Sequence, residues 1–192
     1  MSMNIRPKGS FKKLKSRLIY RARIFELKSV RLRAPDGHEF QHDVVFHPGA
    51  AVIVPVLEPE RFVLVKQYRA AIGKFILEFP AGTLESGEAP LACAKREIVE
   101  ETGFEAKRWH TLASFYPAPG VSTEFMHVFL ASRLTPKRMS LDQDEFIERC
   151  IIPFARLQKM ILDGTIIDAK TIVGFFYYCQ KYRNRSAKAI RF

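Results

Sequence analysis

Three carboxylates gather at the end of one expected helix. Glu97, Glu100 and Glu101 stand at positions i, i+3 and i+4, which places them on one helical face within a single turn. Like charges at these spacings repel, and acidic groups in a last turn face the negative end of the helix dipole, at about 0.3–1 kcal/mol each. A divalent cation would turn this repulsion into binding, because Mg²⁺ is commonly held by one or two carboxylates together with substrate phosphates. The alternative is an ordinary solvated acidic face.

The helix that carries these carboxylates is expected to begin near Pro90 and to end at Gly103. Proline is favoured at the first helical position, and glycine is favoured just after the last turn. The face opposite the carboxylates is apolar enough to dock the helix on a sheet. That face consists of Leu91, Ala94, Ile98 and Thr102.

The segment 82–104 resembles the Nudix box, a pattern of nine positions at fixed spacing. The matching positions are Gly82, Glu88, Arg96, Glu97, Ile98, Glu100, Glu101, Gly103 and Phe104. So many fixed positions are far more specific than a lone glycine motif. The resemblance implies a Nudix hydrolase, an enzyme that uses Mg²⁺ or Mn²⁺ to cut a pyrophosphate linking a nucleoside to another group.

The same resemblance implies roles for the residues of the box. Glu97 and Glu101 are the expected metal ligands, and Glu100 is expected to share or exchange that role. The backbone carbonyl of Ala81, just before the box glycine, is expected to complete the set. Arg96 lies one turn before Glu100 and is expected to orient the carboxylates without touching substrate.

Hydrolysis of a pyrophosphate also needs a base that activates water. The acids of the box are engaged with metal, so the base is expected elsewhere, at Glu145 or Asp144 or, as a rival, at Glu124. Some members of the family carry Glu at the position that resembles Gln143, and Gln is not a base at neutral pH. This departure favours Glu145, although each of the three is equally explained as an ordinary surface carboxylate.

Several stretches outside the box resemble the branch of ADP-ribose pyrophosphatases and nucleoside diphosphate sugar hydrolases. They span residues 47–52, 65–69, 77–82, 116–120 and 164–171. In that branch a proline beyond the box marks enzymes acting on ADP-ribose, and Pro119 stands at a comparable distance. By the same resemblance, Arg69 binds a phosphate through its planar guanidinium, and Glu78 accepts hydrogen bonds from ribose or base. Alternatively, both residues serve only the structure of their strands.

Strand patterns dominate the rest of the chain and predict an α/β fold. The apolar run from Ala50 to Leu57 is typical of a strand buried on both faces. Helices are expected over Phe154 to Leu162 and Ala169 to Tyr182. Together with the box helix they predict an α/β/α sandwich around a mixed sheet, in agreement with the Nudix fold that the box implies.

The expected domain organisation has four parts. Residues 1–15 form a basic, disordered lead, 16–47 a β-hairpin region, 48–185 the Nudix domain and 186–192 a basic tail. The hairpin, with its turn at Pro35–Gly37, cannot easily bury both of its faces alone. We therefore expect it to pack against a second copy, which makes the protein a homodimer.

Composition limits the classes of protein that remain. A chain of 192 residues that is 47% hydrophobic and 27% charged suits a soluble domain. It has neither an apolar run long enough to span a membrane nor a secretory signal. Three widely separated cysteines favour buried thiols over disulfides or zinc, so a cytoplasmic location is expected.

The net charge of +11 keeps two other functions open. Basic residues concentrate at both ends, which suggests an RNA 5′-pyrophosphohydrolase or a non-catalytic, nucleotide-sensing Nudix-like domain whose arms bind nucleic acid. Because neither end interleaves aromatic with basic residues as a stacking platform would, solvated tails are the simpler interpretation. The favoured function is Mg²⁺-dependent hydrolysis of ADP-ribose or a related nucleoside diphosphate sugar to a nucleoside monophosphate and a sugar phosphate.

Overall fold

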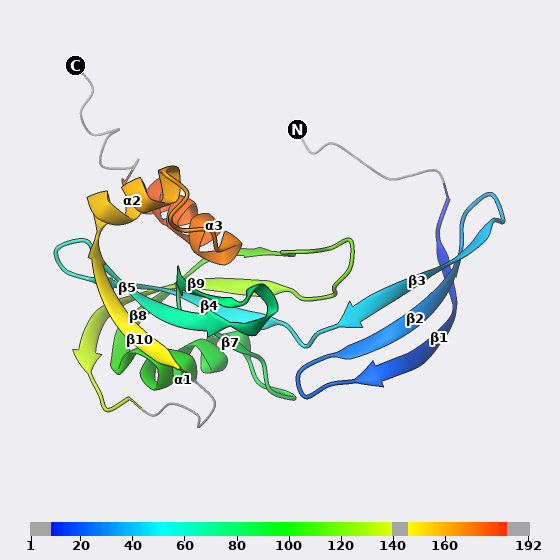
Figure 1. The fold of residues 1–192 in the computed structure, drawn as a ribbon, viewed down its shortest axis with the longest axis horizontal. Coiled ribbons are helices and arrows are strands. Elements are labelled where there is room, and N and C mark those ends of the chain that lie inside the picture. Colours follow the sequence, from blue (N-terminus) through cyan, green and yellow to red (C-terminus); the bar gives the residue numbers. More distant parts are fainter. Residues whose placement is uncertain (1–8, 140–145, 184–192) are drawn as a thin grey trace, which may run out of the picture. The chain divides into compact units, whose positions relative to one another are not determined.

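The structure, a computed structural model, describes residues 9–139 and 146–183. The chain divides into two compact units, and Figure 1 labels their helices and strands. Residues 1–48 and 118–124 form the N-terminal unit, and residues 49–117 and 125–192 form the main unit. No helix in the described ranges is both long enough and apolar enough to cross a membrane.

The N-terminal unit is built on an antiparallel sheet of three strands. Its strands are β1 (Lys12–Arg21), β2 (Glu26–Arg33) and β3 (Glu39–Phe46), in the order β1-β2-β3. The β-favouring residues between Ser16 and Leu32 indicate a single first strand of the hairpin, but a tight turn in which the Ala22 N–H donates to the Phe25 carbonyl at 2.9 Å divides it. Every residue of β1 is exposed.

The main unit contains a mixed sheet of seven strands. They are β4 (Ala50–Leu57), β5 (Arg61–Arg69), β6 (Lys74–Glu78), β7 (Ala81–Thr83), β8 (Phe104–Phe115), β9 (Met126–Pro136) and β10 (Ile147–Pro153). The order is β10-β5-β4-β9-β8, while β6 pairs with β5 and β7 pairs with β4. A short 3₁₀ turn, η1 (Ala70–Ile72), joins β5 to β6. All pairings are antiparallel except that of β4 with β9.

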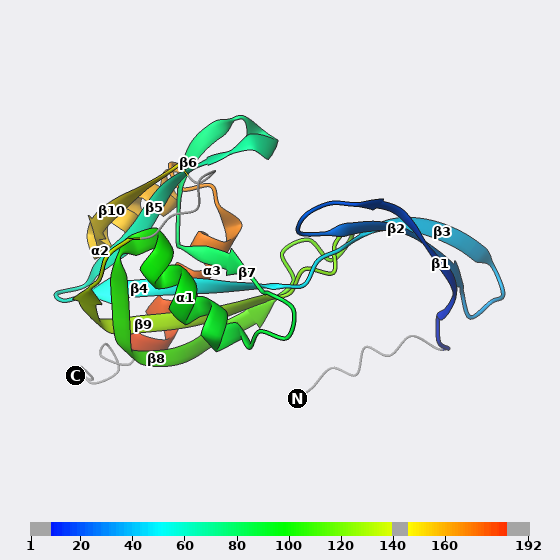
Figure 2. The ribbon, with the colours of Figure 1, turned by 90° about the horizontal axis from the view of Figure 1, so that it is seen from below.

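Helices cover both faces of this sheet. They are α1 (Pro90–Thr102), α2 (Phe154–Leu162) and α3 (Ala169–Tyr178), and α3 continues as the π-helical turn η2 (Cys179–Arg183). Figures 1 and 2 show α1 on one face, with α2 and α3 on the other. The predicted mixed sheet between helical layers is confirmed.

Strand β4 supplies the centre of both cores. Its alternate residues Ala51 and Ile53 pack in a cluster with apolar residues of α1, and Val52 and Val54 pack in the cluster that includes residues of α2 and α3. All four side chains are fully buried. The continuous apolar run is therefore explained by burial on both faces, as the sequence predicted.

Strand β8 begins earlier than its sequence indicates. The apolar pattern of the sequence indicates a strand that starts near Trp109, whereas β8 begins at Phe104, directly after α1. β8 lies at the edge of the sheet, and its first half exposes polar residues such as Glu105, Lys107 and Arg108. Polar exposed positions conceal the pattern of an edge strand.

Arg149 on β10 offsets the unfavourable charge at the end of α1. Its Nη1 donates to the carbonyl of Thr102 at 2.8 Å, and its guanidinium lies 5.0 Å from the ring centroid of Phe104. A cation at a helix C-terminus is favourable because it meets the negative end of the dipole. The acidic last turn is thus partly balanced by a residue from another element.

We expect Arg149→Met to lower the free energy of unfolding by about 1–2 kcal/mol, because it removes this cation and its hydrogen bond. Urea denaturation monitored by circular dichroism measures the change. Arg156→Met, an exposed position on α2, removes the same charge and should leave stability nearly unchanged. Equal losses of unfolding free energy in the two variants would contradict the role of Arg149 in offsetting the charge at the end of α1.

Candidate active site

The box helix forms where the sequence predicts it. α1 begins at Pro90 and ends at Thr102, and Gly103 follows in the left-handed conformation with a φ of 66°. The N–H of Gly103 donates to the carbonyl of Val99 at 3.0 Å. This position favours glycine, because a side chain is strained at such a φ.

Two carboxylates of α1 meet the backbone of β7. Oε2 of Glu101 accepts a hydrogen bond from the N–H of Ala81 at 3.1 Å. Glu97 lies directly against the next residue, because a Cβ added at Gly82 would stand 1.8 Å from Glu97 Oε1. Only 8% of Glu97 and 3% of Glu101 is exposed. The i, i+4 spacing therefore brings two buried carboxylates to consecutive residues of one strand.

Gly82 is a strand residue and does not form a turn. It lies inside β7, and its φ is outside the left-handed region. Glycine is needed here because the Glu97 side chain occupies the place of a Cβ. This requirement is a contact between two distant elements, so no local turn signal reveals it.

Arg96 holds three carboxylates of the box. Its Nη1 donates to Glu97 at 2.7 Å and to Glu100 at 3.0 Å, while Nε and Nη2 each donate to Glu88 at 3.2 Å. The contact expected between Arg96 and Glu100 is present. Hydrogen bonding to Arg96 lowers the pKa of Glu88, and hydrogen bonding to Glu88 is the largest cause that raises the pKa of Arg96.

We predict that the stabilisation contributed by Arg96 depends on pH. The folded pKa of Glu88 lies below its usual value of 4.5, so the contact stabilises the fold above about pH 4.5 and is lost as the pH falls through the folded pKa. The difference in melting temperature between the wild type and Arg96→Met should be largest near neutral pH and shrink in acid. Thermal melts from pH 7 to pH 3 test this. Arg108→Met, which changes an exposed arginine of β8, should show no such trend.

The arrangement fits a hard divalent cation. Within the described residues 9–139 and 146–183, there is no group of three or more His, Cys, Asp or Glu side chains placed to hold a metal. The structure instead brings Glu97 and Glu101 to Ala81 and Gly82 and places Glu100 against Arg96. Two carboxylates beside backbone oxygens provide only oxygen donors, and Mg²⁺ needs one or two carboxylates when phosphates complete its shell.

A second charged group lies at the end of β6. Glu78 is completely buried, and its Oε1 lies 2.5 Å from Nη2 of Arg69. Its Oε2 accepts from Nζ of Lys170 at 2.5 Å, and Nζ also donates to Oδ1 of Asp168 at 3.0 Å. The sequence predicted substrate-binding roles for Arg69 and Glu78. It predicted none for Lys170 and Asp168, although both lie in the stretch 164–171 that resembles the ADP-ribose pyrophosphatase branch.

The remaining predicted residues fall in other parts of the chain. Glu124 and Pro119 belong to the N-terminal unit. The N–H of Glu124 donates to the hydroxyl of Ser122 at 3.0 Å, and its Oε1 lies 3.8 Å from Nδ1 of His47. Asp144 and Glu145, the leading candidates for the base, lie outside the described residues together with Gln143.

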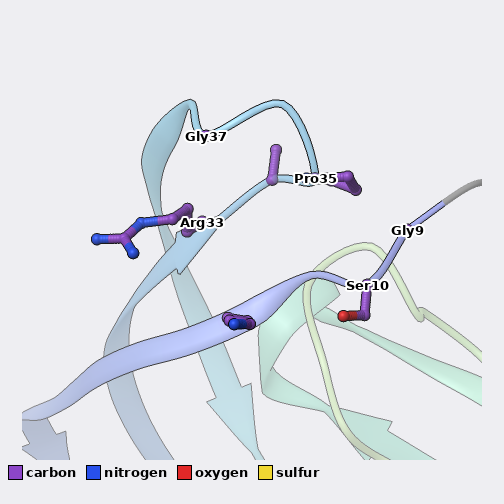
Figure 3. A pocket seen from close by; sticks show the side chains of 7 residues that line it. Gly9, Ser10, Arg33, Pro35 and Gly37 are labelled. Carbon is purple, nitrogen blue, oxygen red and sulfur yellow. The ribbon is translucent and has the colours of Figure 1, made fainter.

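The N-terminal unit also contains a shallow cavity of about 280 Å³, shown in Figure 3. The start of the described chain at Gly9 and Ser10 lines it together with the end of β2 and the turn that follows, including Pro35. None of the predicted site residues lies there. The cavity therefore shares no lining residue with the candidate site on α1 and β7.

Comparison with known proteins identifies relatives of this chain. A family model described as "NUDIX domain" matches residues 46–173. The chain is 35% identical to an ADP-ribose pyrophosphatase of Bacillus subtilis (strain 168) over 161 residues, which cover 83% of this chain and 87% of the relative. It is 34% identical to a methanol dehydrogenase activator of Bacillus methanolicus over 168 residues, or 86% and 91% of the two chains. A crystal structure of an ADP compounds hydrolase shares the fold with a TM-score of 0.82 at 23% identity, covering 94% of this chain and 98% of that one.

Proposed function

Because the chain belongs to the Nudix family of hydrolases, we propose that it cuts the pyrophosphate bond of ADP-ribose or a related nucleoside diphosphate sugar. The products are a nucleoside monophosphate and a sugar phosphate. The observation that carries this proposal is the meeting of buried Glu97 and Glu101 at Ala81 and Gly82. The similarity to the ADP-ribose pyrophosphatase of Bacillus subtilis supports ADP-ribose as the first substrate to test.

We propose that the divalent cation is Mg²⁺, with Mn²⁺ as the alternative. Glu97, Glu101 and the carbonyl of Ala81 would hold it, and Glu100 would join them. When bound, such a cation neutralises charge on the phosphoryl oxygens and lowers the pKa of a bound water. Arg96 holds the carboxylates of the helix in their orientation and offsets their repulsion, because its guanidinium binds Glu97 and Glu100 at once.

Arg69 is the proposed phosphate-binding side chain. It is 40% exposed, whereas its partner Glu78 is 1% exposed at the side chain, so the guanidinium can meet a ligand that the carboxylate cannot reach. We therefore assign Glu78 to holding Arg69, in place of a direct contact with ribose or base. Pro119 remains a proposed substrate contact.

The proposed base is Glu145 or Asp144, with Glu124 as the rival, since each lies outside the metal-binding carboxylates of α1. A carboxylate that serves as the base takes a proton from the attacking water, a contribution of about 10²–10⁴-fold. Single substitutions of Glu145, Asp144 and Glu124 by the corresponding amides, assayed for kcat, would distinguish them. The variant that loses most activity with an unchanged melting temperature identifies the base.

We also propose that the protein is a cytoplasmic homodimer that pairs through the N-terminal unit. Exposed apolar side chains along β1 support this, namely Leu14, Leu18, Ile19 and Tyr20. A β1 edge left open would pair readily with another strand. Light scattering of the purified protein measures the mass, and a monomer at micromolar concentration would exclude the dimer.

The activity is tested with a panel of substrates. ADP-ribose, GDP-mannose, capped nucleotides and 5′-triphosphorylated RNA are incubated separately with the pure protein and Mg²⁺, and the products are separated by chromatography. We expect AMP and ribose 5-phosphate from ADP-ribose. Turnover of the 5′-triphosphorylated RNA and of no other substrate would favour an RNA 5′-pyrophosphohydrolase. No turnover of any substrate by folded protein would favour a nucleotide sensor.

A further inference from the structure

A buried ionic network joins the first turn of α3 to the strand that carries Arg69. Lys170 is buried, and its Nζ lies 2.5 Å from Glu78 Oε2. Glu78 is fully buried, and its other oxygen lies 2.5 Å from Arg69 Nη2. One carboxylate therefore receives two cations, one buried in the protein and one partly exposed to solvent.

Asp168 shares Lys170 with Glu78, because its Oδ1 accepts from Lys170 Nζ at 3.0 Å. Its Oδ2 accepts from the N–H of Thr171 at 3.0 Å and from the hydroxyl of the same residue at 2.6 Å. These groups cap the N-terminus of α3, where the helix dipole favours a negative charge. The helix therefore meets part of the charge of Asp168, and Lys170 can balance Glu78 as well.

The same turn of α3 is hydrogen-bonded to the backbone just before β7, the strand that meets Glu97 and Glu101. The hydroxyl of Thr171 accepts from the N–H of Phe79 at 2.7 Å in a buried position. Phe79 precedes Ala81 by two residues, and Ala81 donates to Glu101. Lys170 therefore lies on a turn that is hydrogen-bonded to the segment between β6 and β7, which is the kind of support that positions a functional side chain.

We propose that Lys170 is a positioning residue for phosphate binding by Arg69. By neutralising Glu78, it leaves the charge of Arg69 available to the diphosphate of the substrate. Without Lys170 the buried carboxylate would be balanced by Arg69 alone, because a buried charge requires a partner. The guanidinium, already 2.5 Å from Glu78, would then neutralise this carboxylate by itself and meet the substrate with little net charge. This inference rests on the proposed function, in which Arg69 binds a phosphate.

The test compares Lys170→Met with Lys170→Arg. Steady-state kinetics with ADP-ribose give KM and kcat, and calorimetry with ADP gives a Kd that does not depend on turnover. For Lys170→Met we expect KM and the Kd for ADP to rise about ten- to a hundredfold, with kcat nearly unchanged. Lys170→Arg should recover most of the affinity, and Lys159→Met on the exposed side of α2 should have no effect.

Two double variants separate positioning from a merely structural role. If Lys170 acts through Arg69, adding Lys170→Met to Arg69→Ala should weaken ADP binding no further. Adding Glu78→Gln to Lys170→Met removes the unbalanced carboxylate and should restore ADP affinity toward that of the wild type. This variant also keeps the inference testable if Lys170→Met alone fails to fold.

The outcomes distinguish this inference from the proposed function. Unchanged KM and Kd in folded Lys170→Met, additive losses with Arg69→Ala, or no recovery with Glu78→Gln would each overturn the role of Lys170. If the wild type binds ADP but does not hydrolyse ADP-ribose, the proposed function fails while the ADP affinities still decide the inference. If the wild type binds no ADP, both fail.

Discussion

Replacing Glu101 with Gln is expected to lower kcat for ADP-ribose by at least about a hundredfold, since even residues that only support a metal ligand typically cost 10- to 100-fold. The amide oxygen of Gln can still accept the hydrogen bond from the Ala81 N–H that Glu101 Oε2 accepts at 3.1 Å. The fold should therefore survive. What is lost is a buried negative charge that would hold the cation. Steady-state rates at increasing Mg²⁺ measure the loss, and saturation should require a higher Mg²⁺ concentration.

The matched control for this variant is Glu105→Gln. Glu105 lies on β8, where its exposed carboxylate pairs with Lys137 at 3.5 Å, so the same chemical change occurs away from the site. We expect activity close to that of the wild type. A comparable loss in both variants, or full activity in Glu101→Gln, would remove Glu101 from the proposed metal site.

Replacing Gly82 with Ala is expected to reduce kcat by about a hundredfold or more, although the change adds a single methyl group. The new Cβ would stand 1.8 Å from Glu97 Oε1 and 2.0 Å from its Cδ. Since real Cβ atoms do not approach so closely, Glu97 must leave its place beside β7. The backbone at position 82 accepts alanine, so the effect reports the displaced carboxylate.

A second glycine provides the control for this steric effect. Gly37 has a φ of 91° and no atom within 4 Å of an added Cβ. Gly37→Ala is thus expected to lower the melting temperature through backbone strain and to leave kcat unchanged. If Gly82→Ala loses stability but keeps its turnover number, the Glu97 carboxylate is not needed in its present place.

The sequence predicted the elements whose physical cause is local. The box helix is delimited by Pro90 and Gly103, and the run 50–57 is apolar at every position that a doubly buried strand requires. The contact of Arg96 with Glu100 follows from helical geometry alone. Such features depend on neighbours within one turn or one strand, so a single sequence contains them.

The parts that the sequence did not predict depend on contacts between distant elements. In the sequence, Arg149 and Lys170 are ordinary basic residues. Only the fold shows that Arg149 contacts the carbonyl of Thr102 and that Lys170 contacts Glu78. The division of the first strand into β1 and β2 is similarly concealed, because exposed positions along β1 remove the alternation that marks a strand. The sequence marked Gly82 as a position of the box, but the contact with Glu97 that requires glycine there appears only in the fold.

The parallel pairing of β4 with β9 affects the order in which the chain acquires its structure. Val52 pairs with Val128, and the cluster that buries α1 includes Phe129 and Ala131 of β9. A contact across such a long loop forms slowly compared with a helix. During synthesis from the N-terminus, α1 is therefore made before its docking surface is complete. β4 and β7, which meet the helix and its carboxylates, precede α1 in the chain, whereas Phe129 and Ala131 cover its apolar face only once β9 has been made.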